Sequence, residues 1–260
     1  MEYKEIIISL IKEFYKKYGI NKFKEHEKWD LFLVRYFNFR LKLIPNIRWN
    51  IQISPNIKDK INKKPELSVP LMNLMKKMSI GEDLNPHQSK TFFNVDYHDM
   101  LFNDWGIHHL HLNDGKKNKG DYLVNRSGPL LFVRFYNNCA YLIDIMNHSD
   151  NDVWANKNMI NIIQQNWPKT IESGLIKDAE FAVDYNDHEI FTLRSKGVTT
   201  GLNINGKSYI LLGHGFACSG DNLMATRMAN EVLRWCHKNE DLLNTNPDLF
   251  KQNIKKQLYL

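Results

Sequence analysis

The sequence predicts an α+β protein with a central antiparallel sheet of hairpins, a helical N-terminal region, and C-terminal strands followed by a helix. Apolar residues recur at helical spacing in the first 80 residues, and short runs rich in β-branched and aromatic residues follow Gly81. The chain has 260 residues, of which 43% are hydrophobic and 25% charged. That composition is typical of a globular protein with a substantial core.

The first 80 residues are predicted to be mainly helical. Residues 2–18 form an amphipathic helix that the following glycine ends, and a second helix covers 25–43 before a proline. A third, short helix lies in "LSVPLMNLMKKMSIGEDL" and stops at its glycine. The stretch between the last two is polar and basic, with one strand at 48–54. Residues 1–80 are therefore assigned to a basic helical region.

Residues 81–170 are predicted to form an α+β core. The runs "WGIHHLHL", "GPLLFVRFY" and "CAYLIDIMNH" are typical of strands. The last two join through Asn137 and Asn138, a favourable hairpin turn because asparagine tolerates positive φ. A helix at 154–165 stops before Pro168.

Residues 171–260 are predicted to form a C-terminal element of strands plus one helix. "AEFAVDY", "EIFTLRSKGV" and "GLNINGKSYILLG" suggest three or four strands, with a hairpin at "NING". The helix lies in "NLMATRMANEVLRWCHK".

The net charge of +6 is concentrated near the N-terminus. Residues 1–65 contain 15 Lys and Arg against 7 Asp and Glu. A local positive surface suits RNA or DNA, because phosphate contacts supply most non-specific affinity. Solvated faces of amphipathic helices explain the same pattern equally well.

The cysteines and the hydropathy predict a cytoplasmic protein with no membrane partner. Cys139, Cys218 and Cys236 are widely spaced and odd in number, which argues against a disulfide framework or a cysteine zinc cluster. No apolar run approaches the roughly 20 residues that span a bilayer, and the charged N-terminal segment is unlike a signal peptide.

The segment "GIHHLHLNDG" carries three histidines in four positions, His108, His109 and His111. On a strand, His109 and His111 share one face about 7 Å apart, and His108 lies on the other. Such a pair either grips one metal ion or places two titratable groups around a reacting atom.

The metal hypothesis needs a third ligand, and no familiar spacing such as H-E-x-x-H is present. The candidate third ligands are Asp104, Asp114, Asp144 and His148.

Without a metal, the surrounding residues favour RNA chemistry. Arg126 precedes the predicted hairpin, Arg134 interrupts an apolar run, and His148 follows the next strand. Histidine and arginine without an obvious nucleophile suit attack of an RNA 2′-hydroxyl on the adjacent phosphate. An ion pair with Asp144 is the structural alternative for Arg134.

The strings "GEDLNPHQSK", "LFNDWGIHHLHL", "GPLLFVRFY", "LIDIMNH", "WA" and "NWP" resemble an ordered motif series of uncharacterised bacterial proteins. These are similar in turn to the barnase–EndoU–colicin–RelE-like (BECR) nuclease group, whose toxins cleave RNA without metal. The match covers roughly residues 80–168.

The resemblance implies a metal-independent ribonuclease of toxin or phage-defence type with no cofactor, a nuclease-like core at 81–170, and RNA such as tRNA or mRNA as substrate. A neutralising antitoxin or regulatory protein is the implied partner. The implied acid and base candidates are His109 and His111, with Arg126 or Arg134 on the phosphate and His148 as a further acid or phosphate contact. His108 is included among the catalytic candidates. The chain is longer than members of that group, which leaves the substrate open.

Other features have mainly structural interpretations. His214, Cys218 and Ser219 lie in a glycine-bounded loop without a known nucleophile signature, and Ser219, Asp221 or Asn222 is expected to cap the following helix. Trp105, Trp154 and Trp167 suit core packing or base stacking. Two rivals to the ribonuclease remain: a non-enzymatic nucleic-acid or protein-binding module, and a His-x-His metal enzyme.

Overall fold

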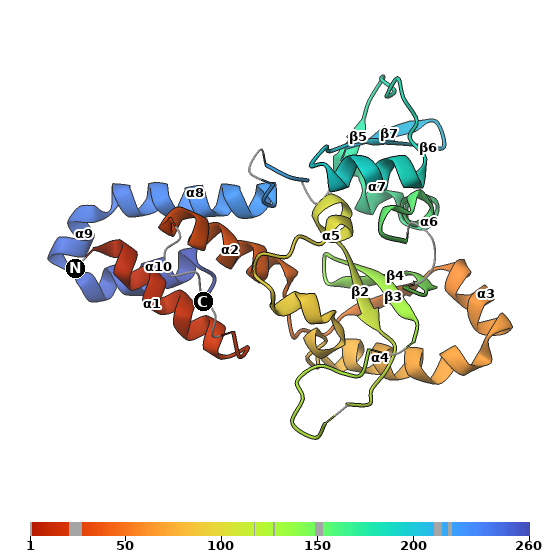
Figure 1. The fold of residues 1–260 in the computed structure, drawn as a ribbon, viewed down its shortest axis with the longest axis horizontal. Helices are drawn as coiled ribbons and strands as arrows, with labels where there is room; N and C mark the ends of the chain where they lie inside the picture. Colours follow the sequence, from red (N-terminus) through yellow and green to blue (C-terminus); the bar gives the residue numbers. More distant parts are fainter. Residues whose placement is uncertain are drawn as a thin grey trace.

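The computed structural model describes residues 2–20, 28–116, 118–126, 128–148, 153–210, 215–217 and 220–260. It confirms the α+β class. N-terminal helices, a mixed four-stranded sheet, a small antiparallel three-stranded sheet and C-terminal helices follow one another along the chain. A helical lobe and a lobe that contains both sheets lie next to each other (Figure 1).

Both ends of the chain contribute to the helical lobe (Figure 1). Its helices are α1 (Tyr3–Lys16), α2 (Trp29–Lys42), α8 (Leu223–Lys238), α9 (Glu240–Thr245) and α10 (Pro247–Gln257). They share one apolar cluster, which includes the buried Ile7, Phe37 and Phe250. The division of the chain at residues 80 and 170 stays a prediction, whereas this cluster joins segments from both ends.

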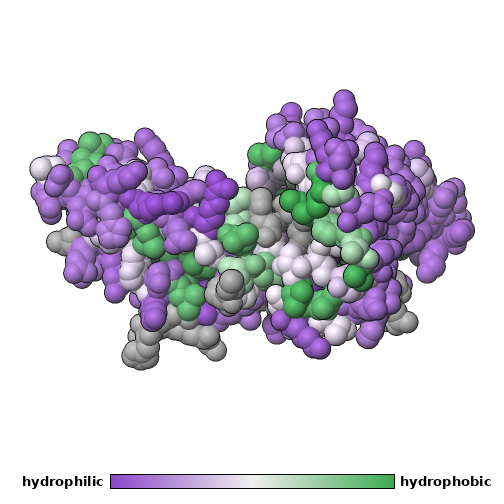
Figure 2. Space-filling view, turned by 90° about the horizontal axis from the view of Figure 1, so that it is seen from above, coloured by the Kyte–Doolittle hydropathy of each residue, from purple (hydrophilic) through white to green (hydrophobic). Residues whose placement is uncertain are grey.

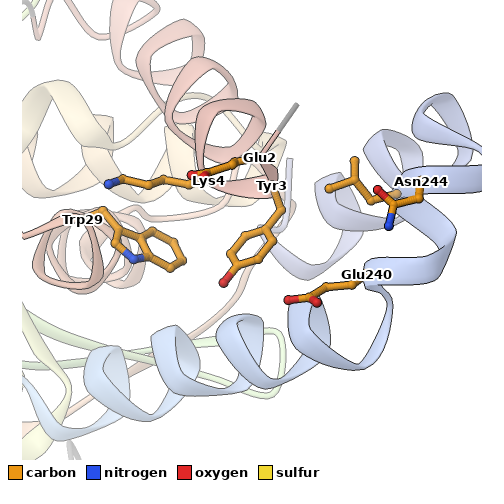
Figure 3. Close-up of a pocket in the computed structure, with 7 residues that line it drawn as sticks. Glu2, Tyr3, Lys4, Trp29, Glu240 and Asn244 are labelled. Atoms are coloured by element: carbon orange, nitrogen blue, oxygen red, sulfur yellow. The ribbon is translucent and has the colours of Figure 1, made fainter.

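A cavity of about 470 Å³ lies where α1, α2 and α9 meet. Tyr3, Trp29 and Glu240 line it, with the two aromatic rings in edge contact at 5.8 Å (Figure 3). These residues belong to the helical lobe and not to the histidine strand.

The larger sheet has the strand order β1-β4-β3-β2. Its strands are β1 (Asn50–Ile53), β2 (Ile107–His111), β3 (Leu130–Tyr136) and β4 (Cys139–Met146). The hairpins are antiparallel as predicted, but β1 pairs parallel to β4, so the sheet is mixed. A distant segment can join the free edge of a hairpin in either direction, which the local pattern does not specify.

The predicted turn between β3 and β4 is confirmed. Asn137 and Asn138 have φ values of 47° and 58°. The carbonyl of Asn138 also accepts a hydrogen bond from Asn50 N at 2.9 Å, where β1 joins the sheet.

Helices cover both faces of the larger sheet. On one face α3 (Pro55–Lys63) and α4 (Ser68–Ile80) pack over a cluster that includes Leu131 and Leu142. On the other, α5 (Met100–Trp105) and α6 (Lys157–Asn166) pack over Phe132. Helix α4 ends at Gly81 as predicted, with φ of 81°.

The second sheet has the order β5-β7-β6, with β5 (Leu175–Ile176), β6 (Leu202–Ile204) and β7 (Lys207–Tyr209). The predicted hairpin at Asn205 and Gly206 is confirmed by their φ values of 49° and 70°. The strand expected in "AEFAVDY" is not formed, and the one expected in "EIFTLRSKGV" is helix α7 (Asp187–Ser195). A capping box between Asn186 and Glu189 favours the helix there.

Hydrophilic residues cover most of the face in Figure 2, and hydrophobic ones gather toward its middle. Within the described residues, no helix has the length and apolar character needed to cross a membrane.

Candidate functional site

The three histidines lie on strand β2, which follows α5 in the chain and pairs with β3. Helix α5 ends at Gly106, whose φ of 65° lets the chain turn directly into the strand. Every residue of β2 is buried. The predicted alternation is confirmed, because Ile107 packs in the cluster under α6 whereas Leu110 packs in the cluster under α4. His109 and His111 thus share the α6 face.

His108 is packed among aromatic rings on the opposite face. Its ring lies 4.7 Å from that of Phe102 and 5.5 Å from that of Phe135, measured between centroids. Burial lowers the pKa of His108 to about 3. The cavity beside His108 and His109 holds only about 10 Å³. That is the space of one water molecule, so no substrate group fits against His108 there.

His109 is held by a carboxylate and an indole. Its Nδ1 lies 3.3 Å from Asp99 Oδ2, and its ring meets Trp154 edge to face at 4.8 Å. Burial lowers the pKa of His109, while Asp99 acts to raise it. Asp99 is itself fixed, because its Oδ1 accepts a hydrogen bond from Phe102 N at the start of α5.

His111 differs from the other two histidines of β2 in its hydrogen bonding. It is 1% exposed, yet neither ring nitrogen has a hydrogen-bond partner among the residues that the structure describes. Its ring centroid lies 5.5 Å from that of the exposed His148. Burial, followed by the fields of His109, His148 and Arg126, lowers the pKa of His111 to about 4. Its imidazole is therefore neutral at pH 7, and both nitrogens remain available.

His87 supports the backbone of His111, a role that sequence reasoning missed. Its Nδ1 donates to the carbonyl of His111 at 2.9 Å, which leaves Nε2 to accept from Lys77 Nζ at 3.0 Å. Lys77 in turn binds Asp114 at 2.5 Å. The only signal for His87 in the sequence was its place in the string "GEDLNPHQSK", since its spacing from other histidines is unremarkable.

His148, Arg126 and Trp154 lie around His111 at the end of the sheet. His148 follows β4 and its ring lies 5.5 Å from that of Trp154. Arg126 precedes β3, is exposed, and has no ion pair or hydrogen bond with any described residue. It is close enough to His111 to lower the pKa of that imidazole. The structure thus gathers four of the predicted site residues: His109, His111, His148 and Arg126.

Arg134 lies at the other end of the histidine strand, opposite Ile107. It donates to the carbonyls of Trp105 at 3.3 Å and Thr170 at 2.7 Å, and its guanidinium lies over the ring of Tyr136. The alternative ion pair with Asp144 is wrong, because Asp144 binds Lys60 at 2.8 Å. Phosphate binding by Arg134 stays a prediction.

The carboxylates named as third metal ligands each face a cation. Asp104 pairs with Arg194, Asp114 with Lys77 and Asp144 with Lys60. Burial still raises the pKa of Asp104 to about 6. Among the described residues no group of three or more His, Cys, Asp or Glu side chains is arranged to hold a metal ion.

The remaining candidates fall into packing and capping roles. Trp105 is buried in the core and Trp167 stacks near Tyr141, so of the three tryptophans only Trp154 touches the histidines. Asn222 is the cap of α8, since its side chain accepts from Ala225 N at 3.1 Å. His214, Cys218 and Ser219 lie outside the described residues.

Searches for similar proteins returned no matching family model, curated protein or solved structure.

Proposed function

We propose that this protein is a metal-independent endoribonuclease whose reaction centre is His111, His148 and Arg126. The observation that carries the proposal is the buried, neutral imidazole of His111, whose two nitrogens have no partner among the described residues and whose ring lies 5.5 Å from an exposed second imidazole. A buried polar group without a partner is costly in a folded protein, so its retention points to a use.

The chemistry follows from the arrangement of these three groups around one point at the end of the sheet. Neutral His111 accepts the proton of the 2′-hydroxyl as that oxygen attacks the adjacent phosphorus. The bond from phosphorus to the 5′ oxygen breaks, His148 donates a proton to the leaving oxygen, and the product is a 2′,3′-cyclic phosphate. Arg126 stabilises the charge of the pentacovalent phosphorane. Trp154 supplies a face on which a neighbouring base can stack.

His109 acts through its neighbours in this scheme. Its contacts with Asp99 and Trp154 leave it in the wall behind the reaction centre. We assign it a positioning role, in which the Asp99–His109–Trp154 chain of contacts fixes the indole next to His148. His108, sealed on the other face, takes no part.

The test is incubation of total RNA with purified protein in EDTA. Wild-type protein is expected to cleave RNA under chelation and to leave 2′,3′-cyclic phosphate ends. His111→Ala and His148→Ala are expected to lose at least a hundredfold in rate, the scale of general acid–base catalysis. His188→Ala is the matched control, because His188 is an exposed histidine of α7. Cleavage that requires added metal, or that survives both site variants, would refute the proposal.

A non-enzymatic nucleic-acid-binding module is the second candidate. The observation that favours it is the burial of all three imidazoles of β2, with pKa values lowered in each case. In that case the histidines are structural and the exposed cations supply affinity. Salt-dependent RNA binding with no cleavage in any lane would support this function over the first.

The setting proposed for the nuclease is a toxin or phage-defence system. A cytoplasmic endoribonuclease is harmful to its own cell unless a neutralising protein or a regulated trigger restrains it. Copurification of an inhibitory protein that restores RNA integrity would identify such a partner.

A further inference from the structure

A basic groove borders the proposed reaction centre. It encloses about 530 Å³ between the C-terminal end of α3 and the ends of β3 and β4. Lys60, Lys63 and Lys64 line one side, and Pro129 and Met146 belong to the other. Glu66 is the one acidic residue among the lining residues in the described part of the chain.

The strand register connects this groove to the histidines. His111 pairs with Leu130 in β3, and Leu130 pairs with Met146 in β4, so one row of residues crosses the sheet from His111 to the groove. At about 4.8 Å per strand, Met146 lies roughly 10 Å from His111 at the backbone. Asn147, another lining residue, directly precedes His148.

The lysines of the groove have two different roles. The ammonium group of Lys60 already has partners within the protein, because its Nζ binds Asp144 at 2.8 Å and the carbonyl of Ile145 at 2.7 Å. Lys63 and Lys64 are exposed, and their side chains have no hydrogen bond or ion pair with any residue that the structure describes. Lys60 and Lys63 are three residues apart and lie on one side of α3, and Lys64 is the residue that follows the end of the helix. The groove therefore presents two free cations above an apolar floor of Leu67, Ile145 and Met146.

We infer that this groove binds the single-stranded RNA that flanks the scissile phosphate. The inference rests on the proposed function. Free ammonium groups match backbone phosphates, and the apolar floor matches a base, as in known single-strand grooves. The row from His111 through Leu130 to Met146 then connects the reaction centre to the groove that Lys63 lines.

Fluorescence anisotropy and steady-state kinetics with a labelled single-stranded RNA test the inference. For Lys63→Gln with Lys64→Gln, we expect the slope of log affinity against log salt to become shallower by about 1.4, at roughly 0.7 per lost phosphate contact. That change corresponds to about tenfold weaker binding at 0.15 M salt. In cleavage, KM rises more than kcat falls. Glu66→Gln is expected to tighten binding.

The matched control is the double variant Lys255→Gln with Lys256→Gln. These two lysines are exposed in the last turn of α10, so their substitution removes the same charge at a distance from the groove. The inference is overturned if both double variants weaken RNA binding equally. It is also overturned if the Lys63 and Lys64 substitutions leave the salt dependence of binding unchanged. If the wild-type protein cleaves RNA and the groove variants bind and cleave it equally well, RNA binding by the groove is refuted and the proposed nuclease function is not affected. If RNA binding depends on Lys63 and Lys64 but no RNA is cleaved, the proposed nuclease function is refuted and the groove remains an RNA-binding site.

Discussion

The histidines of β2 are all buried, and they differ in the side chains that surround them. His108 sits between two phenylalanine rings, His109 is closed in by Asp99 and Trp154, and His111 alone faces an exposed partner ring. Burial of an imidazole favours its neutral form, because a cation loses hydration there. One strand thus carries three buried histidines, and His111 is the one whose ring lies next to that of the exposed His148.

His108 makes stability depend on pH in a predictable direction. Its folded-state pKa of about 3 lies below the ordinary 6.5, so between these values the unfolded chain binds more protons. Stability is therefore lost as the pH falls from 6.5 toward 3. The contribution of one such group is about 1.4 kcal/mol per pH unit.

His108→Gln is expected to remove that contribution. Urea unfolding between pH 4.5 and 7 should show a free energy of unfolding that falls less steeply on acidification in the variant than in the wild type. Exposed His188→Gln is the control and should keep the wild-type slope. Parallel curves for wild type and His108→Gln would show that His108 titrates normally in the fold.

Part of this site was predictable from the sequence. Period-two alternation placed His109 and His111 on one face, and the hairpin placed His148 near them. The surroundings of each ring were not predictable, because they depend on Phe102, Trp154 and Phe135 from three other segments. The partner of Arg134 was likewise set by the carbonyls of Trp105 and Thr170, which no local pattern reveals.

At the scale of elements, local signals succeeded where they were strong. Gly81, the Asn137–Asn138 turn and the Asn205–Gly206 turn each ended or joined elements as predicted. Helix α3 was missed because its apolar content is low, although Ser54 and Pro55 are typical of a helix start. Helix α7 was predicted as a strand because its segment contains β-branched and aromatic residues. The capping box between Asn186 and Glu189 is the local signal that favours the helix.

The turn between β3 and β4 is expected to contribute measurably to stability. Asn138 has a φ of 58°, a conformation that costs a β-branched residue about 1–2 kcal/mol. Asn138→Val should lower the free energy of unfolding by that amount in chemical denaturation. Asn138→Gly tolerates the same φ and should stay within about 0.5 kcal/mol of wild type. Equal losses in both variants would mean that the asparagine side chain, rather than its backbone conformation, stabilises the turn.

At the scale of the whole molecule, the two ends of the chain depend on each other. Helices α8 to α10 complete the apolar cluster of α1 and α2, and the hydroxyl of Tyr36 donates to the carbonyl of Leu258 at 2.5 Å. Periodicity identified the helical pattern of the first 43 residues, but it carries no information on which distant helices cover their apolar faces. The sequence predicted one helix within residues 171–260, and the described part of that segment has four, α7 to α10.

Phe250→Ala tests this dependence. Phe250 is fully buried in α10 against the cluster that both ends share, and truncating such a ring costs about 3–5 kcal/mol. We expect that loss in the free energy of unfolding, together with faster amide hydrogen exchange in α1 and α2, over 200 residues away in sequence. The adjacent Leu249 is 41% exposed, so Leu249→Ala is the matched control and should change neither quantity by much. If exchange accelerates only within α10, the C-terminal helices are an appendage and the N-terminal helices hold their core without them.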